Sequence, residues 1–299
     1  MDRQVTPKQL HSTWLAYAEF RRPVVSPSTY ARDYAKFEKR ILLMMKNRQD
    51  LNDSRDMRQW LLEQFAVETA RRTLQQWNAA FKWAVAMDKF SHNPFVGLAK
   101  YLTHRRQLTE HNYTAFTPDE RSEIIKAFER NDPYYADWVW FLFFTGCRPE
   151  EASALRWENV AHDCSYILIK EARPIDTGIV QPTKNYQATK FPCNAKMQAF
   201  LSRLRESQRC RWVLPSMKGN PFDYKNFQSR HWRPMLEALV CDRKVAFSLG
   251  QYHCRHTFIT EMLKAGISDI DVSYLCRVSI PTIQKYYVSQ SRQIQVPEI

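Results

Sequence analysis

Apolar residues recur along most of the chain at the three- and four-residue intervals that place side chains on one face of a helix. The clearest example lies within residues 71–90, where Leu74, Trp77 and Phe81 share a face. Pro94 follows and is expected to end this helix, because a proline restricts the residue before it to extended conformations. The same spacing returns in most later segments. The pattern predicts a mainly α-helical protein.

A polar stretch without periodicity, THRRQLTEHNYTA, separates two helical regions. It is followed at once by TPDE at residues 117–120, which has the order of a helix N-cap, a first-turn proline and the glutamate of a capping box. We therefore predict a helical domain over residues 1–107, a linker over residues 108–115 and a larger domain over residues 116–299.

The larger domain also contains a strand pattern. Residues 165–170, SYILIK, alternate in the manner of a half-buried strand, and Gly178 with two further extended runs, IVQPTK and ATKFPC, comes after them. This order predicts a small antiparallel sheet. Helical spacing returns from residue 194, and residues 291–299 are expected to form a polar tail.

Charge narrows the class of partner. The 299 residues include 44 Lys and Arg against 31 Asp and Glu, a net charge of +13. Such an excess of positive charge indicates a polyanionic binding partner, most often nucleic acid. Residues 1–112 hold 19 Lys and Arg against 11 Asp and Glu, so the first domain carries more than its share. Candidate phosphate contacts there are Arg71, Arg72, Lys82, Lys89, Arg105 and Arg106.

Cysteine usage and hydropathy argue against a disulfide-stabilised secreted protein and against a membrane-spanning protein. The seven cysteines are dispersed and form no C-x-x-C pair, which predicts a reduced, cytoplasmic protein without a disulfide framework. No apolar run approaches the roughly 20 residues that a membrane-spanning helix needs, and the first residues lack a signal-peptide pattern. Phosphate-cradling glycine loops and clustered metal ligands are also missing from the sequence.

Two stretches combine cations with signals of helix starts. In CRPEE, Pro149 fits a first helical turn, so Arg148 would lie at a helix N-terminus that favours an anion, and Glu151 could aim its guanidinium. In QYHCRHTF, Arg255 stands between two histidines, and two adjacent tyrosines follow about thirty residues later. Guanidiniums that hold a phosphate and a hydroxyl that attacks it indicate phosphodiester chemistry. An ordinary amphipathic helical hairpin accounts for the second stretch equally well.

Taken in order, these segments resemble the tyrosine recombinases of the phage-integrase type over nearly the whole chain. TGCRPEEASALRW resembles the family's first-arginine box, PTKNYQATKFP its lysine hairpin, CRHTF its second-arginine box, and LCRVSIPTIQKYY its nucleophile box. The resemblance assigns the site to Arg148 with Glu151, Lys184, Arg255 with His256, and Tyr286, which lies nine residues after Arg277; Tyr287 is the off-by-one alternative.

Two positions depart from the family pattern. The family usually has His or Lys three residues before the second arginine, where this chain has Tyr252, and His or Trp where this chain has Arg277. The tyrosine and the segments TGCRP and FPCNAK resemble members from cyanobacterial excision elements. A phenol with a pKa near ~10 is a poorer proton acceptor than an imidazole near ~6.5. His253 could take part of that role, although a helical turn would point it elsewhere.

The resemblance implies an N-terminal helical core-binding (SAM-like) DNA-binding domain and an α-rich catalytic domain with a small antiparallel β-sheet. It implies a site-specific recombinase that needs no cofactor, ATP or metal. Arg148, Arg255 and Arg277 would bind one DNA phosphate, and Tyr286 would attack it to give a 3′-phosphotyrosyl bond. Lys184 would protonate the leaving 5′ oxygen, and Tyr252 would steady the phosphate or assist proton movement.

The implied partners are double-stranded DNA and further copies of the chain: a homodimer on one site and a homotetramer in synapsis, with strands exchanged through a Holliday junction. A DNA-bending accessory protein is a further expected partner, and a nucleoid-associated location follows. Two other functions fit the sequence. One is a catalytically silent DNA-binding accessory protein or repressor on the same fold, and the other is a relaxing enzyme of the type IB topoisomerase kind.

Overall fold

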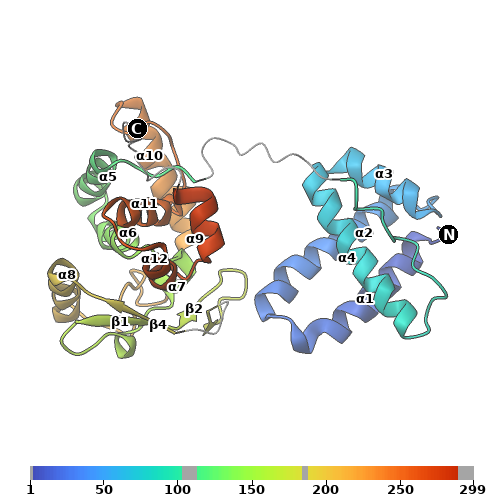
Figure 1. The fold of residues 1–299 in the computed structure, drawn as a ribbon, viewed down its shortest axis with the longest axis horizontal. Helices are drawn as coiled ribbons and strands as arrows, with labels where there is room; N and C mark the ends of the chain where they lie inside the picture. Colours follow the sequence, from blue (N-terminus) through green and yellow to red (C-terminus); the bar gives the residue numbers. More distant parts are fainter. Residues whose placement is uncertain (1–2, 103–112, 184–187, 289–299) are drawn as a thin grey trace, which may run out of the picture. The chain divides into compact units, whose positions relative to one another are not determined.

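The computed structural model describes residues 3–102, 113–183 and 188–288. The chain divides into two compact units, Met1–Gln107 and Leu108–Ile299 (Figure 1). Each unit has its own apolar core. Residues 113–115 of the predicted linker are described and belong to the second unit. The predicted tail at residues 291–299 lies outside the described residues.

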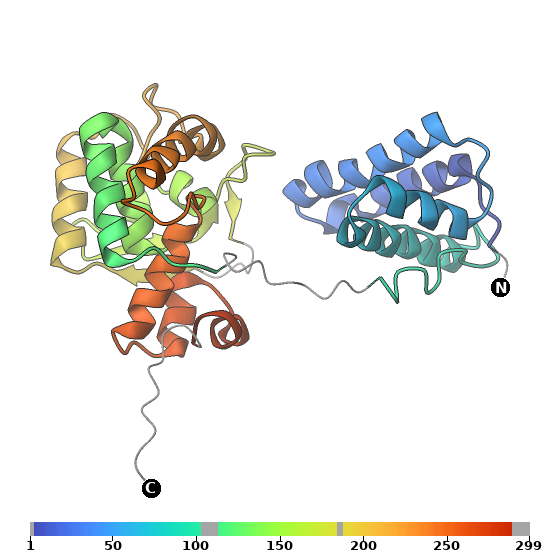
Figure 2. The ribbon, with the colours of Figure 1, turned by 90° about the horizontal axis from the view of Figure 1, so that it is seen from above.

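The first unit is helical. Helix α1 packs against α2 and α4, and α3 packs against α4 (Figure 2). A short 3-10 turn follows α1, and a π-helical turn leads directly into α2. The elements are α1 (Pro7–Arg21), η1 (Arg22–Val24), η2 (Thr29–Tyr34), α2 (Ala35–Asn47), α3 (Ser54–Gln64) and α4 (Val67–Ala86).

Aromatic side chains fill the space between α1, α2 and α4. The Trp14 ring, which is 1% exposed, lies 5.2 Å from the Tyr34 ring and 5.6 Å from the Phe37 ring. Leu74, Trp77 and Phe81 are fully buried on one face of α4, as their spacing predicts. Burial of such large rings supplies most of the packing energy of a small helical unit.

Helix α4 ends before the predicted stop at Pro94. Asp88 adopts a left-handed conformation with φ of 54°, and the Lys89 backbone N–H donates to the Ala84 carbonyl at 2.8 Å. This six-to-one hydrogen bond is the closing bond of a Schellman-type helix end. A local C-cap therefore terminates the helix several residues before the proline could.

The second unit begins as the capping box predicts. Thr117 caps α5 (Pro118–Asn131), with reciprocal hydrogen bonds between Thr117 and Glu120. Helix α6 packs against α5 and α11, and α12 packs against α11. The remaining helical elements are α6 (Pro133–Thr145), α7 (Pro149–Ser153), η3 (Trp157–Asn159), α8 (Ala195–Glu206), α9 (Tyr224–Phe227), η4 (Gln228–Trp232), α10 (Arg233–Cys241), α11 (His253–Lys264), α12 (Asp269–Cys276), α13 (Ile280–Ile283) and η5 (Gln284–Val288).

Helix α6 is the centre of this unit, and its end positions the first site arginine. The run from Trp138 to Phe143 is largely buried. Gly146 ends the helix in a left-handed conformation with φ of 59°, and a Cβ at this position would lie 2.6 Å from the Phe258 ring on α11. Only glycine meets both conditions without strain. The chain can therefore turn sharply from α6 into α7.

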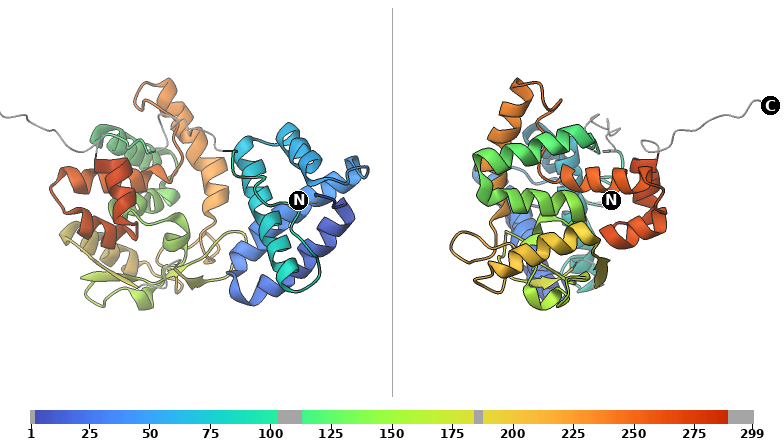
Figure 3. Two further views of the ribbon diagram at one scale, coloured as in Figure 1. Left: turned by 45° about the vertical axis from the view of Figure 1, so that its right-hand side comes forward. Right: turned by 90° about the vertical axis from the view of Figure 1, so that its left-hand side faces the viewer.

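Two small antiparallel sheets take the place of the single predicted sheet. Strand β1 (Tyr166–Ile169) pairs with β4 (Thr189–Pro192), and β2 (Glu171–Ala172) pairs with β3 (Gln181–Pro182). Both lie at one end of the second unit, with α8 beside them (Figure 3). Cα partners run from Tyr166↔Pro192 to Ile169↔Thr189.

The last described elements form a compact helical end. Gly266 has a φ of 83° and turns the chain after α11, and α12 is then capped by Arg277 with a φ of 53°. The short α13 continues directly into η5, which carries the two adjacent tyrosines. None of the helices in the described part of the chain combines the length and the apolar character that a membrane crossing requires.

Candidate active site

The Glu151 carboxylate lies at the centre of the candidate site and accepts four hydrogen bonds. Arg148 donates from its backbone N–H to Oε2 at 2.9 Å and from Nη1 to Oε1 at 2.7 Å. Arg277 donates from Nε to Oε1 at 3.1 Å and from Nη2 to Oε2 at 2.7 Å. The Glu151 side chain is 2% exposed. One buried carboxylate thus orients two arginines from distant parts of the sequence.

The local backbone explains how these side chains meet. Arg148 is the N-cap of α7, with Pro149 in the first turn, so Glu151 in that turn faces back toward it. Arg277 ends α12 in the left-handed region, and its carbonyl accepts a hydrogen bond from Arg148 Nη2 at 2.9 Å. The Arg148 side chain remains 25% exposed, whereas that of Arg277 is 6% exposed.

Arg255 on α11 joins the same cluster. It is 2% exposed. Its Nη1 donates to the Gly146 carbonyl at 2.7 Å, and its Nη2 donates to the Cys276 carbonyl. These carbonyls lie two residues before Arg148 and one before Arg277. A single guanidinium therefore ties together the two turns that carry the other arginines.

The electrostatics of the cluster favour an anion. Burial by itself raises the pKa of the Glu151 carboxyl, but Arg277 first, then Arg148 and Arg255, outweigh burial and hold this pKa at about 2. The carboxylate is therefore charged at neutral pH, as are the guanidiniums. Glu150 lies within the field of the same arginines, and burial first, then Glu151, raises the pKa of its carboxyl. Even with Glu150 ionised, three positive charges and two negative charges leave a net +1 (3 − 2), which suits a phosphodiester.

The two adjacent tyrosines have different surroundings. Tyr287 is 2% exposed, and its hydroxyl is 2.5 Å from His256 Nδ1. Burial, then His253 and Arg255, lowers the pKa of His256 to about 3, and burial raises the pKa of Tyr287. Both partners are thus neutral at pH 7. Tyr286 is half-buried instead, and its ring stacks on Tyr113 with centroids 4.0 Å apart.

Tyr252 lies at the surface of the cluster, 41% exposed, immediately before α11. Its ring lies 5.3 Å from the ring of His256 in an edge-to-face arrangement. His253 points back along the chain, because its Nδ1 lies 3.1 Å from the Gly250 carbonyl. Its ring also contacts that of His256, at 5.1 Å.

Lys184 lies outside the described residues, between Thr183 and the start of β4. The other lysine of this hairpin, Lys190, is on β4, and its Nζ lies 4.2 Å from the Tyr166 ring centroid. The Lys190 backbone N–H also donates to the hydroxyl of Tyr274 on α12 at 3.1 Å. This hydrogen bond connects the hairpin to the helix that ends at Arg277.

The predicted phosphate contacts of the first unit fall into different environments. Arg71 and Arg72 both pair with Glu68 on α4, at 2.7 and 2.8 Å. Lys82 is exposed on the same helix. Arg105 and Arg106 lie outside the described residues.

Of these cations, Arg72 lines a basic hollow of about 750 Å³ between α1, α2 and α4. Five cations and one acid, Asp33, line it, a balance of +4 (5 − 1); the cations are Arg21, Arg32, Lys36, Arg40 and Arg72. Four of these, all except Arg72, were not predicted from the sequence. The sequence does contain a pattern that indicates three of them, because the cations at residues 32, 36 and 40 follow the i, i+4 spacing of one helical face.

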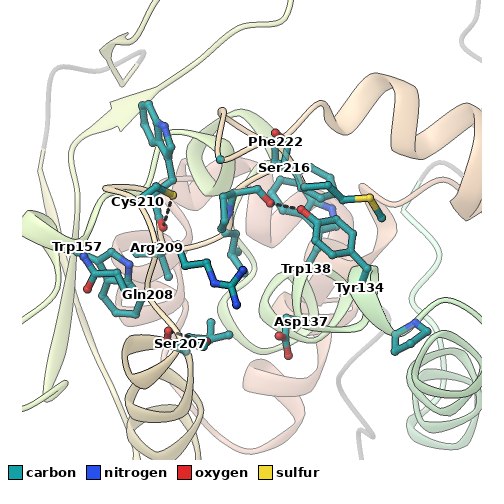
Figure 4. A pocket seen from close by; sticks show the side chains of 18 residues that line it. Tyr134, Asp137, Trp138, Trp157, Ser207, Gln208, Arg209, Cys210, Ser216 and Phe222 are labelled. Atoms are coloured by element: carbon teal, nitrogen blue, oxygen red, sulfur yellow. Dashed lines mark hydrogen bonds between the residues drawn. The ribbon is translucent and has the colours of Figure 1, made fainter.

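A further cavity of about 330 Å³ lies beside the start of α6 (Figure 4). Trp138, Trp157 and Phe222 contribute its apolar walls, and Asp137 and Arg209 contribute charge. The Tyr134 hydroxyl donates to the Pro215 carbonyl at 2.7 Å beside it. None of the predicted site residues that the structure describes lines this cavity.

Comparison with known proteins identifies the family. The model of the phage integrase family matches residues 114–293, more than half of the chain. No curated protein matches the sequence.

Solved structures share the fold. The Tn1549 transposon integrase in complex with a circular intermediate DNA has a TM-score of 0.76 at 15% identity, covering 93% of this chain and 95% of that one. A lambda integrase dimer bound to a COC′ core site has a TM-score of 0.66 at 15% identity, covering 97% and 99%. A lambda integrase tetramer bound to a Holliday junction has a TM-score of 0.67 at 16% identity, covering 99% and 81%. The chain therefore belongs to the phage integrase family and has the tyrosine recombinase fold.

Proposed function

We propose that this chain is a site-specific DNA recombinase that cleaves and rejoins duplex DNA through a 3′-phosphotyrosyl intermediate. The observation that supports it most strongly is the convergence of Arg148, which pairs with the buried Glu151 carboxylate, and Arg255, which donates to the Gly146 carbonyl two residues before Arg148. These arginines are 107 positions apart in the sequence (255 − 148), and they come together with a net positive charge. The η5 turn, which carries the half-buried Tyr286, packs against the helix of Arg255. This arrangement fits a phosphodiester better than a small neutral substrate.

In the proposed reaction, Arg148 and Arg255 contact the non-bridging oxygens of one phosphate and stabilise the charge that develops in the transition state. The Tyr286 oxygen bonds to phosphorus as its proton passes to solvent water, and the bond between phosphorus and the 5′ oxygen breaks. Lys184 donates a proton to that leaving oxygen. The energy of the broken phosphodiester is kept in the phosphotyrosyl bond, so the reverse attack by a 5′ hydroxyl rejoins the strand.

Tyr286 fits the nucleophile better than Tyr287. Tyr287 is buried with its hydroxyl bonded to His256, and burial raises its pKa, which opposes formation of a phenolate. Tyr286 is only half-buried and lies on the adjoining surface. Attack by Tyr287 would require breaking a buried hydrogen bond and opening the core.

Arg277 acts differently from the sequence expectation in this proposal. Its Nε and Nη2 donate to Glu151, its Nη1 donates to the Leu275 carbonyl at 2.7 Å, and little of it is exposed. We infer that Arg277 serves chiefly to neutralise Glu151 and to hold Arg148 through its own carbonyl. Its direct contact with the phosphate is then of secondary importance.

Tyr252 is proposed to steady the phosphate with its hydroxyl, because its side chain is exposed at the edge of the arginine cluster. A hydroxyl can donate to a phosphate oxygen as an imidazolium does, but without carrying charge. Together with TGCRP and FPCNAK, this tyrosine motivates a further proposal, that the chain is related to the recombinases of cyanobacterial excision elements.

The basic hollow of the first unit is proposed to bind the DNA backbone. Its balance of +4 lies in one concave surface, and the buried Nε of Arg21 has no hydrogen-bond partner among the described residues. Phosphate oxygens supply acceptors for such groups. Arg105 and Arg106 are proposed to add backbone contacts from the segment that joins the units, and Arg71 and Lys82 from α4.

Assembly on DNA completes the proposal. The structurally similar lambda integrase forms a dimer on a core site and a tetramer on a Holliday junction. We propose the same states for this chain: a homodimer on one site and a homotetramer in synapsis. A DNA-bending accessory protein would bring the two sites together.

Covalent trapping tests the function. Nicked duplexes tiled across the DNA that flanks the coding region would be incubated with the wild-type chain and with Tyr286→Phe. We expect a denaturant-resistant protein–DNA adduct for the wild type and none for Tyr286→Phe, with equal DNA binding by both. Adduct formation by the phenylalanine variant would refute the assigned nucleophile.

One observation favours a second function, that of a silent DNA-binding protein on the same fold. Arg255 and Arg277 are both nearly buried and donate to protein acceptors. If these contacts persist on DNA, the phosphate would meet only Arg148. A wild-type chain that binds the tiled duplexes tightly but traps none of them would support this second function.

A further inference from the structure

We propose that Tyr113 is a positioning residue for the nucleophile Tyr286. The proposal rests on the function proposed above. Tyr113 lies within the predicted linker, where no role was expected for it. The structure instead places its ring directly on the ring that is proposed to attack DNA.

The contact between the two rings is close and well aligned. Their centroids are 4.0 Å apart, and their planes differ by 9°. The edge of the Tyr113 ring also meets the ring of His256 at 5.2 Å and that of Tyr287 at 5.6 Å. Tyr113 thus contacts both tyrosines of η5 and the histidine that follows Arg255.

The segment that carries Tyr113 is fixed to the site. The Phe116 backbone N–H donates to the Thr257 hydroxyl at 2.9 Å, and Thr257 is fully buried on α11. Thr117 then begins α5 through its capping box. The hydrogen bond ties residue 116 to the helix turn that contains Arg255, so Tyr113 and the arginine cluster share one support.

Stacking of this kind limits the orientations of a phenol. A tyrosine ring on the surface can rotate about its Cα–Cβ and Cβ–Cγ bonds, and a parallel neighbour opposes rotations that tilt the ring out of the stack. In-line attack on phosphorus requires the oxygen to approach from one direction, and positioning of reacting groups is a large part of rate enhancement. The stack therefore restricts the orientation of the Tyr286 ring before DNA binds, so fewer orientations are sampled before the one that attacks.

The Tyr286 ring has a second neighbour. Lys285 Nζ lies 5.2 Å from its centroid. Lys285 is exposed and adjacent in sequence, so it moves with η5 and offers no fixed reference. Tyr113 comes from a segment more than 170 residues away in sequence (286 − 113 = 173) and is anchored independently. Of these two neighbours, Tyr113 is the one that can set the ring relative to the arginines.

The test compares Tyr113→Phe, which keeps the stack, with Tyr113→Leu, which removes it. The readout is the single-turnover rate of adduct formation at saturating nicked duplex, beside the dissociation constant from fluorescence anisotropy. We expect Tyr113→Leu to lower the rate by about tenfold, the order that the loss of one stacked aromatic pair predicts. Tyr113→Phe should stay within about twofold of wild type, and neither variant should change the dissociation constant by more than that.

Tyr134→Leu is the matched control. Tyr134 is also partly exposed on the second unit and packs edge-on against a tyrosine ring, but it borders the cavity of Figure 4. Its loss should leave the rate unchanged, so a generic destabilising effect would appear in both leucine variants. Thermal unfolding of each variant checks folding separately.

The outcomes separate the two proposals. If the wild type forms no adduct, the proposed function fails, whatever Tyr113 does. If the wild type reacts, three results overturn the positioning role: a Tyr113→Leu variant as fast as wild type or faster, a Tyr113→Phe variant as slow as Tyr113→Leu, or equal losses in Tyr113→Leu and Tyr134→Leu.

Discussion

The Arg277 guanidinium forms a two-point hydrogen-bonded pair with the Glu151 carboxylate, with distances of 3.1 and 2.7 Å. The same carboxylate receives two more hydrogen bonds from Arg148. Arginine stands where the family usually has histidine or tryptophan, and its fork geometry satisfies both carboxylate oxygens at once. The substitution thus fits the local structure instead of disrupting it.

The first prediction concerns Arg277→Lys. A lysine keeps the positive charge but cannot make the two-point contact with Glu151. We expect the rate of adduct formation to fall by about tenfold or more, the order that loss of one charge-assisted hydrogen bond predicts, while DNA affinity stays the same. Single-turnover trapping with an anisotropy control measures both. An unchanged rate would show that charge alone suffices at this position.

The second prediction concerns Glu151→Gln. An amide of the same shape leaves the nearly buried Arg277 guanidinium and the partly exposed Arg148 guanidinium without their counter-charge. Breaking a buried ion pair costs on the order of 3 kcal/mol. We expect the urea midpoint of the second unit to fall accordingly. Glu158→Gln is the control, because Glu158 pairs with Arg156 at 3.1 Å while its side chain is 59% exposed. Equal effects of the two substitutions would contradict the importance of the buried pair.

The third prediction is a pH dependence of stability caused by His256. Its pKa in the folded chain is about 3, below the ordinary value of 6.5, chiefly because of burial. The unfolded chain therefore binds more protons between these values, and stability is lost as pH falls from about 6.5 toward 3. At pH 5 the loss is of the order of 2 kcal/mol relative to pH 7.5.

The measurement is the urea midpoint at pH 5 and pH 7.5 for the wild type and for His256→Asn. Asparagine retains a polar group near Nδ1 but does not titrate, so the variant should lose less stability between the two pH values. The same decline in both proteins would mean that other groups cause it. Glu151 titrates at lower pH than His256, because the pKa of its carboxyl in the folded chain is about 2, below the ordinary 4.5. Its contribution to stability is therefore lost only as pH falls below about 4.5.

The fourth prediction tests the basic hollow. Lys36→Gln removes a cation that lines it, whereas Lys46→Gln removes an exposed cation from the same helix outside it. We expect Lys36→Gln to weaken binding to duplex DNA and to reduce the slope of log affinity against log salt by about 1. Lys46→Gln should change neither quantity. Equal slopes for the two variants would place the DNA elsewhere on the first unit.

Much of the architecture could be predicted from the sequence, because the signals were local. The TPDE capping box predicted the start of α5, the spacing of Leu74, Trp77 and Phe81 predicted the buried face of α4, and the alternation at residues 165–170 predicted β1. The family motifs identified Arg148 and Arg255 as site candidates, and the structure brings them into one cluster.

The remaining features depend on tertiary contacts that no local pattern contains. The pairing of Arg277 with Glu151 spans 126 residues and depends on the left-handed turn at the end of α12. The stacking of Tyr113 on Tyr286 joins the start of the second unit to its last described element. Helix α4 ended early because Asp88 closes it locally, a stop for which the sequence offered only the more distant Pro94.

The most direct test of the central claim is to identify the residue that carries DNA. The wild-type chain would be trapped on a nicked duplex and digested, and tandem mass spectrometry would locate the attached nucleotide within the peptide that contains both tyrosines. The arrangement of the site predicts a nucleotide on Tyr286, linked through the 3′ phosphate. A nucleotide on Tyr287, or no adduct on any of the flanking duplexes, would contradict it.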